Sequence, residues 1–235
     1  MNPKTFLLIH GAWHGGWAWC RVAERLRARG HAVFTPTLTG LGERAHLLHP
    51  RIDASLHVAD VLAVIKYERL KDIVLVGHSY GGSVISCVAE AAPDAISSVV
   101  FLDAFIPDNG DATIDHVQPA VQEVIRAALD RGETTVPVRS AAAFNVNEKD
   151  RAWVDSLANP QPILTMTEKL NLTGARERIA KKTYIRASGY PNVSFEKAYA
   201  RVRSDPGWRT YEVPCGHDVM IDAPDRLTEI LIEAA

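Results

Sequence analysis

The stretch "DIVLVGHSYGG", residues 72–82, decides the fold that this sequence predicts. Its first half is rich in β-branched residues and too apolar for an exposed strand, which indicates a central strand of a parallel sheet. Its second half contains G-x-S-x-G, centred on Ser79, directly after that strand and directly before a helical segment at 80–91. The motif glycines leave room for a sharp turn that strains the backbone of Ser79 and lifts its hydroxyl above the sheet. Ser79 is therefore the predicted nucleophile; the alternative is a glycine-rich turn with a helix-capping serine.

Strand-like and helix-like segments alternate on both sides of this stretch. Further strands are predicted at residues 5–11, 31–38, 97–104, 181–188 and 208–214, and further helices at 19–30, 55–70 and 223–235. Gly30 is the predicted end of the first helix. Alternation of this kind predicts an α/β fold, in which a mainly parallel sheet of about six strands is flanked by helices with right-handed crossovers.

One region breaks the alternation. Residues 107–178 contain helical pieces at 120–132, 147–158 and 162–174 but no convincing apolar strand. We predict a core made of residues 1–106 and 179–235, with a small helical cap, 107–178, inserted after the strand that ends at Asp103. A separate domain is the less favoured alternative, because no Pro/Gly/Ser-rich linker brackets the region.

Composition narrows the function classes. Of the 235 residues, 47% are apolar and 23% charged, with a net charge of -2 and no basic patch, so we expect no nucleic-acid partner. The start of the chain lacks the regions of a signal peptide, and no run approaches the roughly 18 apolar residues of a membrane span. Three widely spaced cysteines predict neither a disulfide framework nor a metal site. The expected location is the cytoplasm.

A serine hydroxyl needs a base to take its proton, and His217 is the best-placed candidate. Of the nine histidines, only His217 follows both the G-x-S-x-G motif and the last predicted strand, in "EVPCGHDVMIDAP", residues 212–224. His116, the other histidine beyond Ser79, falls in the predicted cap. The alternative for His217 is a solvated loop histidine.

The negative oxygen of a tetrahedral intermediate needs hydrogen-bond donors. Tyr80, directly after the nucleophile, is predicted to supply one backbone N–H. "HGAWHGGW", residues 10–17, begins where the first strand ends, and Ala12 is predicted to supply the second. The alternative is that these glycines only form a turn. As a phosphate-binding loop the stretch lacks the required glycine spacing.

Three motifs in order, "LIHGAWHGGWAW", "VLVGHSYGG" and "GHD", resemble the α/β-hydrolase superfamily. More closely, they resemble its branch of plant methyl-ester esterases of the salicylate-binding type, hydroxynitrile lyases and bacterial esterases. The resemblance extends from near residue 5 to the C-terminus, and the cap matches only loosely. It implies a Ser-His-acid triad, no cofactor, and a pocket between cap and sheet.

The acid of the triad departs from that branch. There it usually follows the next-to-last strand, but residues 189–192 carry no carboxylate, and Glu196 is expected to lie in the next helix. Asp103 directly follows the strand after the nucleophile, a place that other α/β-hydrolases use for the acid. A buried carboxylate needs a partner, and the ring N–H of His217 would provide one. Asp103 is therefore the predicted acid; the alternatives are a turn-capping Asp103 or one of Asp205, Asp218 and Asp222.

These features predict a serine hydrolase that cleaves a small carboxylic ester or lactone through an acyl-enzyme. The expected partner is a small-molecule substrate with an apolar or aromatic part, and a homodimer is left open. Four side chains are candidates for the pocket, with core packing or a turn as their alternatives: Trp13, His14, Phe105 and Trp153.

Three other functions compete with ester hydrolysis. A hydroxynitrile-lyase-like C–C lyase is disfavoured, because the related lyases carry lysine and threonine where this chain has Asp218 and Ala12. A non-catalytic small-molecule-binding protein gains weight from the displaced acid. Cofactor-free oxygen chemistry on the same fold is the third.

Overall fold

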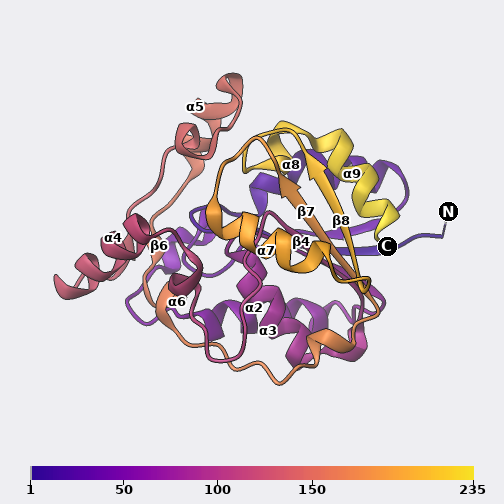
Figure 1. The fold of residues 1–235 in the computed structure, drawn as a ribbon, viewed down its shortest axis with the longest axis horizontal. Coiled ribbons are helices and arrows are strands. Elements are labelled where there is room, and N and C mark those ends of the chain that lie inside the picture. The colour runs from indigo at the N-terminus through magenta and orange to yellow at the C-terminus, as the bar shows by residue number, and fades with distance from the viewer. Residues whose placement is uncertain (1) are drawn as a thin grey trace.

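The computed structural model describes residues 2–235, and a six-stranded parallel sheet forms its centre (Figure 1). The strands lie in the order β2-β1-β3-β4-β7-β8, and each neighbouring pair is parallel. Their bounds are β1 Thr5–Ile9, β2 Ala32–Phe34, β3 Ile73–His78, β4 Ile96–Leu102, β7 Lys181–Ala187 and β8 Trp208–Val213. The predicted parallel sheet of about six strands is thereby confirmed.

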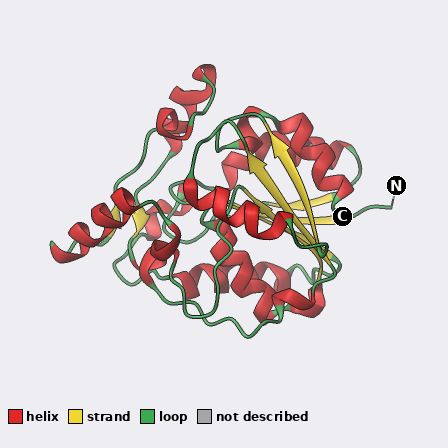
Figure 2. Ribbon diagram, in the orientation of Figure 1, coloured by secondary structure: helices red, strands yellow, loops and turns green. Residues whose placement is uncertain are grey.

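Helices cover both faces of this sheet (Figure 2). The helices of the sheet's own connections are α1 Cys20–Ala28, α2 Ala54–Tyr67, α3 Gly81–Ala91, α7 Val193–Arg203, α8 Val219–Asp222 and α9 Pro224–Glu233. Helix α1 packs against α9, and α2 packs against α3. In Figure 1 the α8–α9 segment and the α2–α3 pair lie on opposite sides of the strands.

Local sequence signals set several helix ends. The carboxylate of Asp53 accepts the backbone N–H of Leu56 at 2.9 Å and so caps α2. Asn192 caps α7 in the same way, accepting from Ser194. Gly30, the predicted stop of α1, has φ +84°, a conformation that glycine adopts without strain.

The strand register brings the chemistry to one edge. Ile9 at the end of β1 pairs with Gly77 of β3, and His78 pairs with Leu102 at the end of β4. The loops that follow β1, β3, β4 and β8 therefore leave the sheet together at its carboxyl edge. Ligands bind at this edge in open α/β sheets.

The segment between β4 and β7 differs in part from the prediction. It contains α4 Pro119–Asp130, α5 Glu148–Leu157 and α6 Leu164–Thr167, and α4 and α5 project away from the sheet in Figure 1. It also contains two strands, β5 Thr135–Val136 and β6 Gln161–Pro162, which form an antiparallel pair. Neither is an apolar run, and two-residue strands leave no periodic pattern by which the sequence could predict them. The division into core and cap stays a prediction.

The third helix predicted in this segment, 162–174, is reduced to the single turn of α6. Beyond it Lys169 forms a β-bridge with Ala112, and the Leu170 N–H donates to the Asp111 carbonyl at 2.8 Å. These backbone bonds to another segment replace those that would continue the helix. Short 3-10 turns occur at Gly16–Trp19, Gly42–Leu47, Pro93–Ala95, Thr113–His116, Ala141–Phe144 and Arg176–Arg178. None of the helices within residues 2–235 has the length and apolar character that crossing a membrane requires.

Candidate active site

Ser79 lies in the tight turn between β3 and α3. Its φ is +53°, a left-handed conformation that non-glycine residues adopt only under strain. A Cβ atom at Gly77 would lie 2.5 Å from the carbonyl oxygen of Gly81, and one at Gly81 would lie 2.8 Å from the carbonyl oxygen of Ile9. Both glycines are therefore required by the close approach of backbone to backbone, and the turn holds Ser79 at the start of α3.

His217 and Asp103 meet at the same edge. The Nδ1 atom of His217 lies 2.7 Å from Oδ2 of Asp103, and both side chains are buried. An ionised carboxylate only accepts hydrogen bonds, so Nδ1 carries the proton and Nε2 is left as an acceptor. His217 shares the lining of one cavity with Ser79. The structure thus brings together the three residues that the sequence predicted as nucleophile, base and acid.

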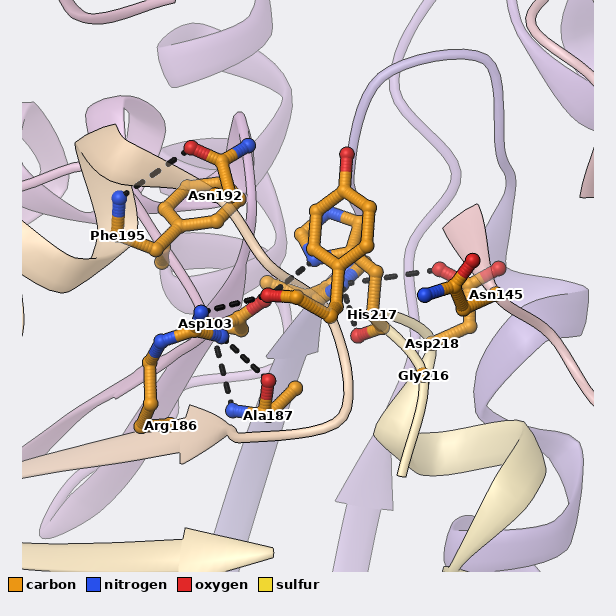
Figure 3. A network of polar contacts seen from close by, with 12 residues as sticks. Asp103, Asn145, Arg186, Ala187, Asn192, Phe195, Gly216, His217 and Asp218 are labelled. Atoms are coloured by element: carbon orange, nitrogen blue, oxygen red, sulfur yellow. Dashed lines mark hydrogen bonds and ion pairs between the residues drawn. The ribbon is translucent and has the colours of Figure 1, made fainter. Parts of the chain in front are cut away.

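The other side of the Asp103 carboxylate is occupied by Arg186 (Figure 3). Oδ1 of Asp103 accepts from Nη1 of Arg186 at 2.7 Å and from the Ala187 N–H at 3.1 Å. Arg186 also pairs with Glu196 at 2.7 Å and donates to the Tyr190 carbonyl at 2.6 Å. The charge of the buried carboxylate is therefore balanced by a cation other than the histidine.

Sequence reasoning missed Arg186, although a signal for it existed. An arginine within the otherwise buried run of β7 needs a buried anion. Burial disfavours the charged guanidinium, yet the charges and hydrogen bonds of Asp103 and Glu196 prevail and raise the pKa of Arg186. Glu196 lies in α7, as expected, and reaches the site only through this arginine.

Aromatic rings fix the orientation of the His217 imidazole. The ring of Phe195 stacks on it with centroids 5.0 Å apart and planes 16° apart, and the rings of Tyr190 and Phe144 lie at 4.9 Å and 5.5 Å. Phe144 comes from the predicted cap, and its carbonyl accepts the His217 N–H at 2.9 Å. No separate sequence signal marks these three rings, because aromatic residues are common in any core.

The predicted oxyanion loop is held by the segment between β4 and β7. Trp13 has φ +65°, and its backbone N–H donates to the side chain of buried Gln161 at 3.0 Å. Its indole N–H donates to the Val136 carbonyl at 3.3 Å, and its own carbonyl accepts from Asn159 at 2.9 Å. These bonds tie the turn around Ala12 to β5 and β6.

The two predicted donors are the backbone N–H groups of Ala12 and Tyr80. Both residues line the cavity together with Ser79. Among residues 2–235, neither N–H is engaged with a protein acceptor. Both donors are therefore free to receive a negatively charged oxygen.

The cavity is small and mostly apolar. Its volume is about 40 Å³. It is lined by Ala12, Trp13, Ser79, Tyr80, Phe105, Val117, Gln118, Val121, Arg139, Phe144, Met166, Tyr190, Asn192, Phe195 and His217. Trp13 and Phe105, two of the four predicted pocket residues, belong to this lining.

The other two predicted pocket residues lie elsewhere. Both ring nitrogens of His14 are engaged beneath the lining, with the Ala12 carbonyl at 2.7 Å and Asp218 at 3.1 Å. Trp153 packs edge-on against Trp17, with ring centroids 5.3 Å apart. Neither side chain belongs to the lining of the cavity or of the groove beside it.

The alternative acids have partners other than His217. Asp218 pairs with His14, and Asp222 accepts from the Gly216 N–H at 3.1 Å. Asp205 accepts from the Gly207 N–H at 2.8 Å in an exposed turn. Of the described carboxylates, only Asp103 forms a hydrogen bond with the His217 ring.

A wide groove continues from the cavity to the surface. Its volume is about 760 Å³, and it shares Phe105, Val117 and Gln118 with the cavity. The remaining lining comes from the loop after β4, the 3-10 turn Thr113–His116, the start of α4 and α7: Ile106, Asp115, His116, Pro119, Ala120, Gln122, Val193, Ser194, Lys197, Ala198 and Arg201. Within the described residues no cluster of three or more metal-ligating side chains occurs.

Comparison with known proteins identifies the family to which this chain is similar. The model of the "Alpha/beta hydrolase family" matches residues 6–230. A carbendazim hydrolyzing esterase of Nocardioides sp. is 40% identical, over 97% of this chain and 98% of its own. Methylesterase 4 of Arabidopsis thaliana is 26% identical, over 100% of this chain and 97% of its own.

Solved structures of related proteins have the same fold as this chain. An extracellular alpha/beta-hydrolase from a Paenibacillus species, described as structurally and functionally homologous to tobacco Salicylic Acid Binding Protein 2, superposes with a TM-score of 0.85. It is 27% identical to this chain and covers 99% of both chains. The resemblance to this branch is thereby confirmed.

Proposed function

Because this chain belongs to the alpha/beta hydrolase family and its named relatives make it a carboxylic ester hydrolase, we propose that it cleaves small esters through a Ser79–His217–Asp103 triad. The observation that carries this proposal is the 2.7 Å bond between His217 and Asp103 beside a cavity that Ser79 also lines. That bond supports an orientation in which Nδ1 faces the acid and Nε2 is the ring nitrogen available to act as the general base.

The reaction proceeds in two halves. The Ser79 oxygen attacks the ester carbonyl carbon while His217 Nε2 takes the hydroxyl proton, and the N–H groups of Ala12 and Tyr80 stabilise the negative carbonyl oxygen. The carbon–oxygen bond to the alcohol breaks, and His217 protonates the departing alkoxide. Water then attacks the acyl-enzyme and gives its proton to His217, which returns it to Ser79 as the acid leaves.

The two unequal spaces support a substrate class. A cavity of about 40 Å³ has room for little more than the ester group and one small substituent. The groove of about 760 Å³ offers room for a larger, partly apolar substituent. We therefore expect esters with one small and one large side, and the methylesterases among the relatives are consistent with this expectation.

The experiment is a rate comparison with p-nitrophenyl acetate, butyrate and octanoate. We expect Ser79→Ala to lower kcat by at least about 10⁴-fold, because removal of the nucleophile disables the whole triad. Ser204→Ala, in an exposed position, is the matched control and should behave as wild type. For the wild type, kcat/KM should fall from acetate to octanoate. In the octanoate both the acyl chain and the p-nitrophenyl group are large, so neither fits the small cavity.

Two results would count against the proposal. Substantial ester hydrolysis by folded Ser79→Ala would assign the nucleophile to another residue. Equal kcat/KM for acetate and octanoate would remove the distinction between the small cavity and the large groove.

A further inference from the structure

One permanent charge faces the cavity. Of the described residues that line it, only Arg139 is charged at every working pH. Its guanidinium lies over the Phe144 ring, 5.1 Å from the centroid, and that ring lies 5.5 Å from the ring of His217. Phe144 therefore contacts both Arg139 and the ring of the predicted base.

The donors of Arg139 are uncommitted. Within residues 2–235 its guanidinium enters no hydrogen bond and no ion pair, whereas Arg186 and Arg21 each pair with a carboxylate at 2.7 Å. Its N–H groups therefore have no acceptor among these residues. A guanidinium matches the two oxygens of a carboxylate, which it binds with two parallel hydrogen bonds.

We propose that Arg139 binds a carboxylate on the larger part of the substrate, so that the preferred esters are half-esters of dicarboxylic acids. This inference rests on the proposed esterase function. Arg139 is half-buried, and a substrate carboxylate would supply the anionic partner that the described residues do not. Neutral esters of the same length lack this interaction.

The test compares monomethyl succinate and monomethyl glutarate with the neutral esters methyl butyrate and methyl valerate, by release of acid at constant pH. Arg139→Gln should lower kcat/KM for the half-esters by about 10-fold or more, because it removes a charge-assisted, two-point contact. The ratio of kcat/KM for the half-esters to kcat/KM for the neutral esters should fall with it, because the neutral esters make no such contact. For the half-esters, kcat/KM of Arg139→Lys should lie between the values of the wild type and Arg139→Gln. Lysine keeps the positive charge but cannot donate two parallel hydrogen bonds to a carboxylate.

Arg178→Gln removes the same charge from an exposed position outside the cavity and is the matched control. A wild type that hydrolyses the neutral esters as well as the half-esters overturns the role of Arg139 and leaves the esterase function standing. An equal loss on both ester types in Arg139→Gln also overturns it. A wild type inactive on every ester, the p-nitrophenyl esters included, overturns the proposed function itself.

A second inference rests on different residues, the buried histidines, whose partners fix their protonation. In His10 one ring nitrogen faces the Gly11 carbonyl at 2.8 Å and the other accepts the Leu38 N–H at 3.0 Å. His57 lies between a backbone carbonyl at 2.9 Å and the Tyr80 hydroxyl at 3.0 Å. Each ring needs only one proton, and burial lowers the pKa of His10 to about 3 and that of His57 to about 4.

His14 differs, because both of its nitrogens face groups that only accept. Nδ1 lies 2.7 Å from the Ala12 carbonyl oxygen, and Nε2 lies 3.1 Å from the Asp218 carboxylate. Both contacts are hydrogen bonds only if both nitrogens carry protons. The ring also stacks on Trp17 with centroids 5.3 Å apart, an arrangement that favours a cation.

The electrostatic surroundings agree with a charged ring. Burial disfavours the charge, yet Asp218 and the Ala12 carbonyl prevail and raise the pKa of His14. The other titratable groups that face it are His78, at a ring distance of 6.3 Å, and His10. Both have lowered pKa values, chiefly through burial, so at neutral pH neither carries a charge that opposes His14.

We propose that His14 is a buried imidazolium whose pairing with Asp218 positions the Ala12 turn relative to the loop that holds His217. Asp218 follows His217 directly in the chain, and the Ala12 carbonyl accepts the other His14 proton. His78 adds a third link by bonding to the His217 carbonyl at 3.1 Å. His14 is thus a positioning residue, which acts on the oxyanion donor and the base together.

The first test is NMR of ¹⁵N-histidine-labelled wild type at pH 7, with assignments from His14→Gln and His78→Gln. Both nitrogens of His14 should be protonated, and only one nitrogen of His78. A neutral His14 at pH 7 overturns the inference. This measurement needs no variant of Asp218 to fold.

The second test is kcat against pH for Asp218→Asn and His14→Gln. Each should lower kcat by up to about 100-fold with little change in KM, because a misplacement of about 1 Å at a reacting centre has effects of this size. The wild type should lose kcat as pH rises through the pKa of His14, and both variants should lack that decline. His31→Gln, a buried histidine that contacts Lys4 and Phe6, is the control. An unchanged alkaline decline in both variants overturns the inference.

Discussion

Two buried histidine–aspartate pairs lie at the same edge of the sheet and differ in what surrounds them. His217 and Asp103 are 2.7 Å apart, and His14 and Asp218 are 3.1 Å apart. The second nitrogen of His217 belongs to a ring that lines the cavity, whereas the second nitrogen of His14 meets the Ala12 carbonyl. The first ring can therefore accept a proton, and the second is fixed as a donor on both sides.

The charge balance of the two carboxylates differs as well. Asp103 has Arg186 on its other oxygen, so His217 need not be charged to compensate it. Asp218 has no arginine or lysine partner within residues 2–235, and its nearest cation is the ring of His14. Burial opposes its ionisation, but the neighbouring histidines, His14 first, lower the pKa of Asp218. A third group therefore decides the role of each His–Asp pair. Where an arginine balances the carboxylate, the histidine is left to act as a base, and where no arginine is present, the histidine itself is the cation.

The largest effect is expected from Asp103→Asn, which breaks the first pair. An asparagine amide donates toward Nδ1, so His217 would be held in the tautomer with Nε2 protonated and could not take the proton of Ser79. We expect kcat to fall by about 10⁴-fold with the fold retained. Ester hydrolysis at equal folded concentration measures this, with Asp205→Asn as the exposed control. Near-normal kcat would make Asp103 a structural residue.

The next effect is expected from Arg186→Met. This change leaves Asp103, like Asp218, without an arginine partner. Removing one partner of a buried ion pair destabilises a protein by about 3–5 kcal/mol. Urea unfolding measures this loss of stability. Arg226→Met, which breaks an exposed pair with Glu229, is the control and should cost under about 1 kcal/mol.

The smallest effect is expected in the pH dependence of stability that His14 confers. Because the folded pKa of His14 is raised, its contribution is fully present below the unfolded value of 6.5 and is lost as pH rises through the folded value. The Tm advantage of the wild type over His14→Gln should therefore shrink with rising pH. Thermal unfolding from pH 6 to pH 9 measures this. An advantage that is constant over this range would mean that His14 is neutral throughout.

Several elements followed from local sequence. The apolar run before Ser79 and the glycines around it are sufficient to specify a buried strand and a tight turn, because both depend on neighbouring residues alone. The position of Asp103 at the end of a buried strand pointed to a buried partner, because an unpaired carboxylate is unfavourable there. The strand pair β5–β6 and the end of α6 could not be predicted, since two-residue strands and single helical turns carry no periodicity.

By itself, then, the sequence determined the parallel sheet and the turn at Ser79, and it predicted His217 and Asp103 as the candidate base and acid. Only the tertiary structure decided which groups surround them: Arg186 on Asp103, the rings against His217, and Gln161 on the Trp13 turn. It also decided that His14 meets Asp218, which lies 204 residues away along the chain. The physical reason is that protonation, charge balance and cavity shape depend on contacts between distant segments, and local patterns contain no record of which segments will meet.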